Sequence, residues 1–188
     1  MKIDKRLNLV SVYDTASGPV HVHAAPVSRL VFETYYQPIA KAWASIFSKG
    51  LLVHSGPRVA SLLLRDAATE LGVWDTPGGV KQGLVAELRR LTNVVMATDR
   101  GWRTRPLQDV IDGRLMDEDD IAEVENDVTF FICASAMAKR SELPLLMSVV
   151  TRLSGTACTS LNVTEYAASL PTSTAAETMQ ASTSSLPT

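Results

Sequence analysis

His21 and His23 are the first residues whose type and spacing could support chemistry, because alternate residues of a strand point to the same face of a sheet. Two imidazoles placed side by side can share a zinc ion, but such a site needs further ligands. No Cys, Asp or Glu joins the pair at a recognised ligand spacing, and His54 is distant in the sequence. The pattern favours two histidines on the solvent-facing side of a strand and predicts no metal site.

The acidic run of residues 117–120 could in principle hold a hard cation or supply an acid and a base. It lacks the alternating oxygen ligands and the central glycine of a calcium loop. Carboxylates in the first turn of a helix are stabilised by the positive end of the helix dipole, so we interpret the run as a helix start. The alternative is a small metal-dependent hydrolase or nuclease that uses Asp117, Asp119 and a histidine.

The candidate nucleophiles and glycine motifs have little support. Ser55 follows His54, but neighbours in sequence seldom have the geometry of a base and its nucleophile, and no GxSxG motif is present. Gly78 and Gly79 belong to neither a GxxxxGK[ST] nor a GxGxxG motif. Cys133 lies in the apolar segment FFICASAM, which indicates a core thiol. The sequence therefore predicts a protein that is not an enzyme and takes no cofactor.

The tryptophans are candidates for contact with a protein partner, since this side chain supplies a large contact area at low entropic cost. Trp43 falls on a helical apolar stripe and is expected in the core, whereas Trp74 and Trp102 lie in segments rich in turn formers. Arg103 and Arg105 follow Trp102 and are of a type common at interfaces. We predict that Trp74, Trp102, Arg103 and Arg105 contact a partner.

The elements that must position these residues indicate an α+β fold that is mainly helical. Residues 8–13 and 19–24 alternate apolar with polar types around a turn-forming run, which predicts an N-terminal β-hairpin over 8–24. Apolar residues then recur at helical spacing, and Thr98 to Arg105 is expected as a loop or short strand. We expect about five or six helices, over 28–50 with a kink at Pro38, 57–72, 80–95, 117–140, 141–153 and a short one over 160–168, and one or two helical turns over 106–112.

The composition bounds the organisation of the chain. With 188 residues and 46% hydrophobic side chains, it can bury one core, so we expect a single globular domain over residues 1–169. Residues 170–188 consist mostly of Ser, Thr, Ala and Pro with almost no charge, and we expect a flexible tail.

Charge and hydropathy argue against other classes of protein. The net charge of −2 and the dispersed Lys and Arg residues lack the basic stripe that nucleic-acid backbones require, so no nucleic-acid partner is expected. A helix-turn-helix regulator over Pro57 to Leu91 stays as a weaker alternative. No apolar segment is long enough to span a bilayer and the first residues lack a signal peptide's apolar core, so we expect a cytosolic protein without membrane contact.

The order of several segments resembles the tail assembly chaperones of siphophages. These segments are MKIDKRLNLV, GPRVASLLLRDAATELGVW, RRLTNVV, AEVEN, RSELP and TSLNVTEYAASLPTST, and they span nearly the whole chain. The resemblance implies a protein of the host cytoplasm, absent from the mature virion, that binds the tape measure protein, keeps it soluble and promotes tail tube assembly. It further implies the major tail protein and a longer frameshifted form of the chain as partners. Apolar helices in this number also make a homo-oligomer plausible.

Overall fold

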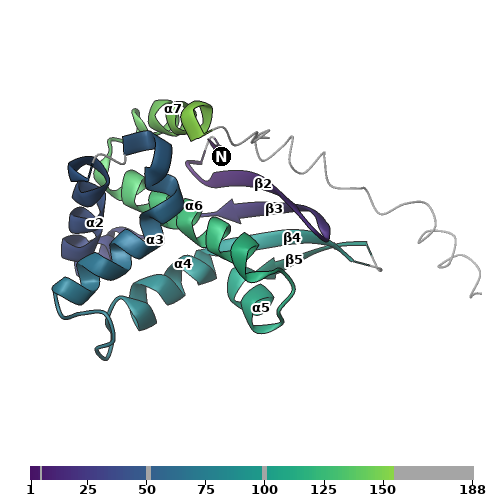
Figure 1. The fold of residues 1–188 in the computed structure, drawn as a ribbon, viewed down its shortest axis with the longest axis horizontal. Helices are drawn as coiled ribbons and strands as arrows, with labels where there is room; N and C mark the ends of the chain where they lie inside the picture. Colours follow the sequence, from purple (N-terminus) through teal and green to yellow (C-terminus); the bar gives the residue numbers. More distant parts are fainter. Residues whose placement is uncertain (5, 50–51, 99–100, 155–188) are drawn as a thin grey trace, which may run out of the picture.

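A five-stranded antiparallel sheet packs against a group of helices in the computed structural model, which describes residues 1–4, 6–49, 52–98 and 101–154 (Figure 1). The strands are β1 (Lys2–Ile3), β2 (Leu9–Thr15), β3 (Gly18–Ala24), β4 (Thr92–Thr98) and β5 (Gly101–Pro106), and they lie in the order β1-β2-β3-β4-β5. The helices are α1 (Arg29–Thr34), α2 (Tyr36–Ser48), α3 (Leu52–Glu70), the π-helix η1 (Lys81–Val85), α4 (Ala86–Leu91), α5 (Leu107–Asp112), α6 (Glu118–Met137) and α7 (Leu143–Ser154). The predicted α+β, mainly helical class is confirmed.

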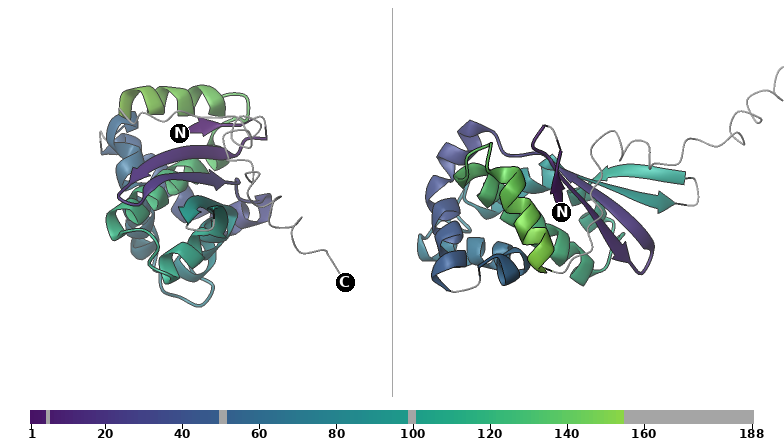
Figure 2. Two further views of the ribbon diagram at one scale, coloured as in Figure 1. Left: turned by 90° about the vertical axis from the view of Figure 1, so that its right-hand side faces the viewer. Right: turned by 90° about the horizontal axis from the view of Figure 1, so that it is seen from above.

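The N-terminal hairpin is formed by β2 and β3, as the alternation of residue types predicts, with Tyr13 opposite Val20 and Leu9 opposite Ala24. Alternate residues of these strands, such as Val20 and Val22, join the main core. Both β-hairpins of the sheet extend beyond the helices, which lie on one side of the molecule (Figure 2). No helix of the described ranges therefore covers the ends of β2, β3, β4 and β5 that lie next to the turns.

The first helical segment is interrupted where the sequence predicts a kink. Ser28 caps α1 through its hydroxyl oxygen, which accepts a hydrogen bond from the Val31 amide at 3.3 Å. The helix ends at Thr34 and α2 begins at Tyr36. Pro38 accounts for the break because it has no amide hydrogen and its ring conflicts with the carbonyl of the residue four positions earlier.

The second predicted helix begins earlier than expected. The start at Gly56 and Pro57 was wrong, because α3 already begins at Leu52 and contains Pro57. Gly56 is buried, and a Cβ added there would lie 2.7 Å from Cγ2 of Ile46 and 3.5 Å from Phe130. The glycine thus permits close packing of α3 on its neighbours rather than marking a helix end.

The third predicted helix also needs a correction. The helical segment ends at Leu91, and Val95, the last residue of the helix predicted over 80–95, lies in β4. Residues 92–98, TNVVMAT, are rich in β-branched types and pair with β3 on one side and β5 on the other. The segment from Thr98 to Arg105, predicted as a loop or short strand, contains most of β5.

The core is centred on α6, which contacts α3, α2 and β2. This helix, predicted over 117–140, buries Val124, Val128, Phe130 and Phe131. α7 packs on β1, and the Thr151 hydroxyl donates to the Met1 carbonyl at 2.6 Å, so the last described helix covers the β1 edge of the sheet.

No helix within the described ranges is long and apolar enough to cross a membrane. The helix expected over 160–168 and the tail expected over 170–188 lie outside the described residues.

Candidate partner-binding cleft

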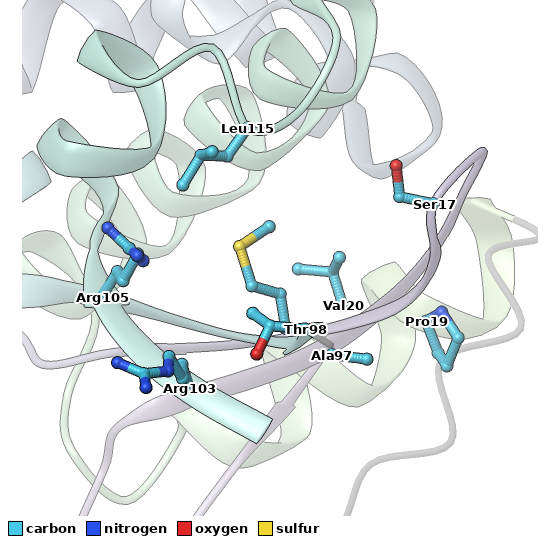
Figure 3. A pocket seen from close by; sticks show the side chains of 9 residues that line it. Ser17, Pro19, Val20, Ala97, Thr98, Arg103, Arg105 and Leu115 are labelled. Atoms are coloured by element: carbon cyan, nitrogen blue, oxygen red, sulfur yellow. The ribbon is translucent and has the colours of Figure 1, made fainter. Parts of the chain in front are cut away.

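An open cleft of about 510 Å³ lies where the tips of both hairpins extend past the helices. Its lining residues come from the β2–β3 turn, from β3, β4 and β5, and from the segment before α6; they are Ser17, Pro19, Val20, Met96, Ala97, Thr98, Arg103, Arg105 and Leu115. Figure 3 shows Arg103 and Arg105 on one side of this opening, Ser17 on the other and Leu115 above it. The structure therefore brings two of the predicted partner-binding residues to one concave surface.

The register of the sheet explains why both arginines face the cleft. Met96 is opposite Arg103, and Val94 is opposite Arg105. Residues directly opposite each other in an antiparallel pair share a face, so the arginines project from the same face as the buried Val94 and Met96. At this end of the sheet the helices no longer cover that face, and Arg103 is exposed.

The cleft combines positive charge with an apolar floor. Val20 and Met96 are 2% and 7% exposed, and Leu115 is 36% exposed at the opposite wall. Neither Arg103 nor Arg105 forms an ion pair with any carboxylate of the described residues. Guanidinium groups with no acidic partner beside apolar side chains favour a ligand that has both acidic and apolar groups.

Trp102 lies on the opposite face of the sheet from these arginines. Its ring meets the ring of His21 edge to face, with 5.4 Å between the centroids, and both side chains are partly buried. Burial lowers the pKa of His21 below its ordinary value, which keeps the imidazole neutral at pH 7. Trp102 therefore flanks the β5 edge from the other side and is not a lining residue of the cleft.

Trp74 is separated from the other predicted partner-binding residues. It lies in the connection between α3 and η1, which Figure 1 places at the end of the molecule opposite the hairpin tips. Its ring packs against the core and lies under the Arg65 guanidinium, 5.7 Å from the ring centroid. The four predicted partner-binding residues therefore lie in three places: Arg103 and Arg105 at the cleft, Trp102 on the other face of β5, and Trp74 between α3 and η1.

His21 and His23 share one face of β3, as predicted, but their surroundings differ. His23 Nε2 lies 3.9 Å from Oδ2 of the buried Asp4. Asp4 in turn accepts hydrogen bonds from the backbone amides of Arg6 and Asn8 at 2.7 and 2.9 Å, so it organises the turn after β1. The described ranges contain no group of three or more His, Cys, Asp or Glu residues that could hold a metal ion.

The acidic run begins α6 as predicted. Asp117 is the N-cap, and its Oδ1 accepts a hydrogen bond from the Asp120 amide at 2.9 Å. Asp119 lines a second cleft of about 560 Å³ with Glu123 and Asp127, but no histidine is among its lining residues. The combination of acid and histidine that the hydrolase alternative requires is not assembled there.

Asp127 is a buried carboxyl group that the sequence pattern did not single out. It is 6% exposed, and the Tyr13 hydroxyl donates a hydrogen bond to its Oδ2 at 2.8 Å. Burial raises its pKa to about 6, although the Tyr13 hydrogen bond and the charge of the N-terminal amine act in the opposite direction. The bond links β2 to α6, so we assign Asp127 a structural role.

Cys133 is fully buried in α6, where burial raises the pKa of its thiol to about 12, so it is no nucleophile. Cys158 lies outside the described residues.

The helix-turn-helix alternative over Pro57 to Leu91 has a connection of unsuitable length. Residues 71–80 join α3 to η1, and this connection is longer than the short turn of a helix-turn-helix motif.

Sequence reasoning missed the apolar half of the cleft. Met96 and Val20 would follow from strand pairing, because once 92–98 is assigned as a strand, the hairpin register places Met96 opposite Arg103. Leu115 has no local signal, since only the tertiary fold brings the segment before α6 to the sheet.

Comparison with known proteins gives no assignment. No protein-family profile, curated protein or solved structure matches this chain. The functional argument therefore depends on the cleft and on the order of segments in the sequence.

Proposed function

We propose that the protein is a phage tail assembly chaperone that binds the tape measure protein, keeps it soluble and promotes assembly of the tail tube. The observation that supports this best is the open cleft in which Arg103 and Arg105 lie beside Val20, Met96 and Leu115. Arginine beside apolar side chains is typical of protein interfaces, and Leu115 is the exposed apolar residue of this cleft. A client that would otherwise self-associate needs such a surface to compete for its apolar segments.

The same proposal includes the other expected partners and the setting. The chaperone acts without catalysis in the host cytoplasm and is left out of the mature virion. It recruits the major tail protein to the tape measure protein, and a longer frameshifted form of the chain supplies a second set of contacts. Tethering two binding modules in one chain raises the effective concentration of the second partner.

The test is co-expression with the candidate tape measure protein. The wild-type chain should keep the client in the soluble fraction and co-elute with it. The double variant Arg103→Glu/Arg105→Glu should lose most of the co-eluting client, because the charge of the cleft is reversed. The matched control is Arg6→Glu/Arg140→Glu, which reverses two exposed arginines that line a different surface. A folded wild-type protein that neither solubilises nor co-elutes with the client would refute the proposal.

A further inference from the structure

The edge of β5 differs from the other edge of the sheet. β1 forms one edge and packs on α7. β5 is the last strand at the other edge; α4 and α5 contact it, but Gly101, Arg103 and Thr104 are exposed and no further strand is paired to it in the described part of the chain. An unpaired edge presents a row of N–H and C=O groups that can pair with an additional strand. The edge lies directly beside the arginine side of the cleft (Figure 3).

The ladder between β4 and β5 indicates which backbone groups face outward. Pro106 is opposite Asn93, and a proline has no N–H to donate into the ladder. Along an antiparallel ladder, residue pairs joined by backbone hydrogen bonds alternate with pairs that are not. Since Pro106 and Asn93 form a pair without these bonds, the pairs at Thr104 and Trp102, two and four residues earlier, also lack them. The N–H and C=O groups of Trp102 and Thr104 therefore point away from β4, toward the open edge.

The side chains on β5 restrict what such a strand can be. Arg103 and Arg105 are two residues apart on one face, roughly 7 Å along the strand. When two side chains face each other on neighbouring strands, charges of opposite sign stabilise the strand pair and charges of the same sign destabilise it. An incoming chain with acidic side chains at alternate positions satisfies both arginines, while its other side chains lie on the face of Trp102.

We propose that β5 accepts an extended acidic segment of the client polypeptide as a sixth strand, with alternate carboxylates bound by Arg103 and Arg105. The identity of the client rests on the proposed function, but the acceptor edge does not. A polypeptide is favoured over a nucleic acid because the outward groups of Trp102 and Thr104 alternate between donor and acceptor, which another peptide backbone matches. With six residues, β5 provides about 20 Å of edge, enough for a short strand.

The first test uses a fluorescently labelled peptide of alternating Glu and Val, with anisotropy as the measurement. Thr104→Pro removes the outward N–H at an exposed edge position, where proline is tolerated, and should weaken binding by about tenfold or more. Thr104→Ala keeps the N–H and should bind like the wild type. A peptide whose alternate amides are N-methylated should also fail to bind, and this arm needs no variant of the protein.

The second test reverses the charges. Arg103→Glu/Arg105→Glu should lose the Glu–Val peptide and gain a matching Lys–Val peptide, which the wild type should reject. Equal binding of the Glu–Val peptide by wild type and Thr104→Pro would overturn strand addition. So would binding of short single-stranded DNA by both proteins when neither binds the peptide, because the arginines would then be a nucleic-acid contact.

Co-expression separates this inference from the proposed function. If Thr104→Pro keeps the tape measure protein soluble as well as the wild type does, strand addition at β5 is wrong while the chaperone role stands. If the wild type binds the peptide as expected but leaves the client insoluble, the acceptor edge stands and the chaperone role is wrong.

Discussion

Asp127 shows how one residue can make the stability of this fold depend on pH. Its carboxylate is disfavoured in the folded protein, with a pKa of about 6 against roughly 4 in an unfolded chain. The resulting penalty is fully present above pH 6. It decreases between pH 6 and pH 4, where only the folded state binds the proton, and is absent below the unfolded pKa, where both states are protonated. Asp127→Asn removes this dependence. Urea unfolding from pH 4 to pH 8 should show the variant gaining roughly 2 kcal/mol relative to the wild type.

A second variant for that experiment is Glu123→Gln, which neutralises an exposed carboxylate one helical turn earlier in α6 whose charge also raises the pKa of Asp127. Because burial is the larger cause, this variant should gain only a small part of what Asp127→Asn gains over the same range of pH. A stability difference between Asp127→Asn and the wild type that stays constant from pH 4 to pH 8 would contradict the raised pKa.

Gly83 is required by a contact rather than by its backbone conformation. The Tyr35 hydroxyl donates to the Gly78 carbonyl at 2.9 Å and passes directly over Gly83, where an added Cβ would overlap the phenol oxygen. Gly83→Ala should therefore displace Tyr35 and lower the free energy of unfolding by about 1–3 kcal/mol. In a Tyr35→Ala background the same change should cost almost nothing, and thermal unfolding of the four proteins measures this coupling. An equal cost in both backgrounds would place the strain elsewhere.

At the scale of elements, patterns of neighbouring residues predicted those strands and helix ends that depend mainly on neighbouring residues. The alternation in β2 and β3 and the acidic start of α6 were identified because the residues that define them are adjacent in sequence. Val95 was placed in a helix because it follows Leu88 and Leu91 at spacings of seven and four, which both suit a helical face. Its strand conformation depends on pairing with β3, which lies about seventy residues earlier in the chain.

The candidate site divides in the same way. Arg103 and Arg105 were predicted from residue type, and Met96 would follow from the β4–β5 register once residues 92–98 are assigned as a strand. Leu115 is brought to the cleft only by the tertiary fold. Trp74 and Trp102 were both selected because their segments are rich in turn formers, but composition does not determine the distance between the α3–η1 connection and β5. Long-range contacts of this kind have no local pattern from which they could be predicted.

The start of α6 provides the test at this scale. Asp117→Ala removes the hydrogen bond to the Asp120 amide and should lower the free energy of unfolding by about 1 kcal/mol. Glu118→Ala, which removes an acidic residue from the first turn but no cap, should cost less. Urea titration in the presence and absence of Mg²⁺ or Mn²⁺ should give the same values, because we assign the run to capping. Stabilisation of the wild type by either ion, lost in Asp117→Ala, would instead favour the metal-dependent alternative.

At the scale of the whole molecule, the two edges of the sheet have different surroundings, and α7 is the cause. This helix covers β1 and buries Leu143, Met147 and Val150, each at most 1% exposed. Burying three such side chains contributes roughly 5–9 kcal/mol, which is comparable with the total stability of an ordinary domain. The β5 edge, to which no further strand of the described residues is paired, can bind a partner only while the β1 edge and the core beside it keep the domain folded.

Two truncations test this division of the chain. A protein that ends at Ala138 loses α7, so it should unfold without a cooperative transition and aggregate through the uncovered β1 edge. A protein that ends at Ser169 keeps all of the described elements and should melt within a few degrees of the full chain, because the residues removed are those expected to form the flexible tail. Differential scanning calorimetry with light scattering distinguishes the two results. A large loss of stability on ending the chain at Ser169 would mean that residues 170–188 belong to the folded domain, and the predicted boundary would have to move toward the C-terminus.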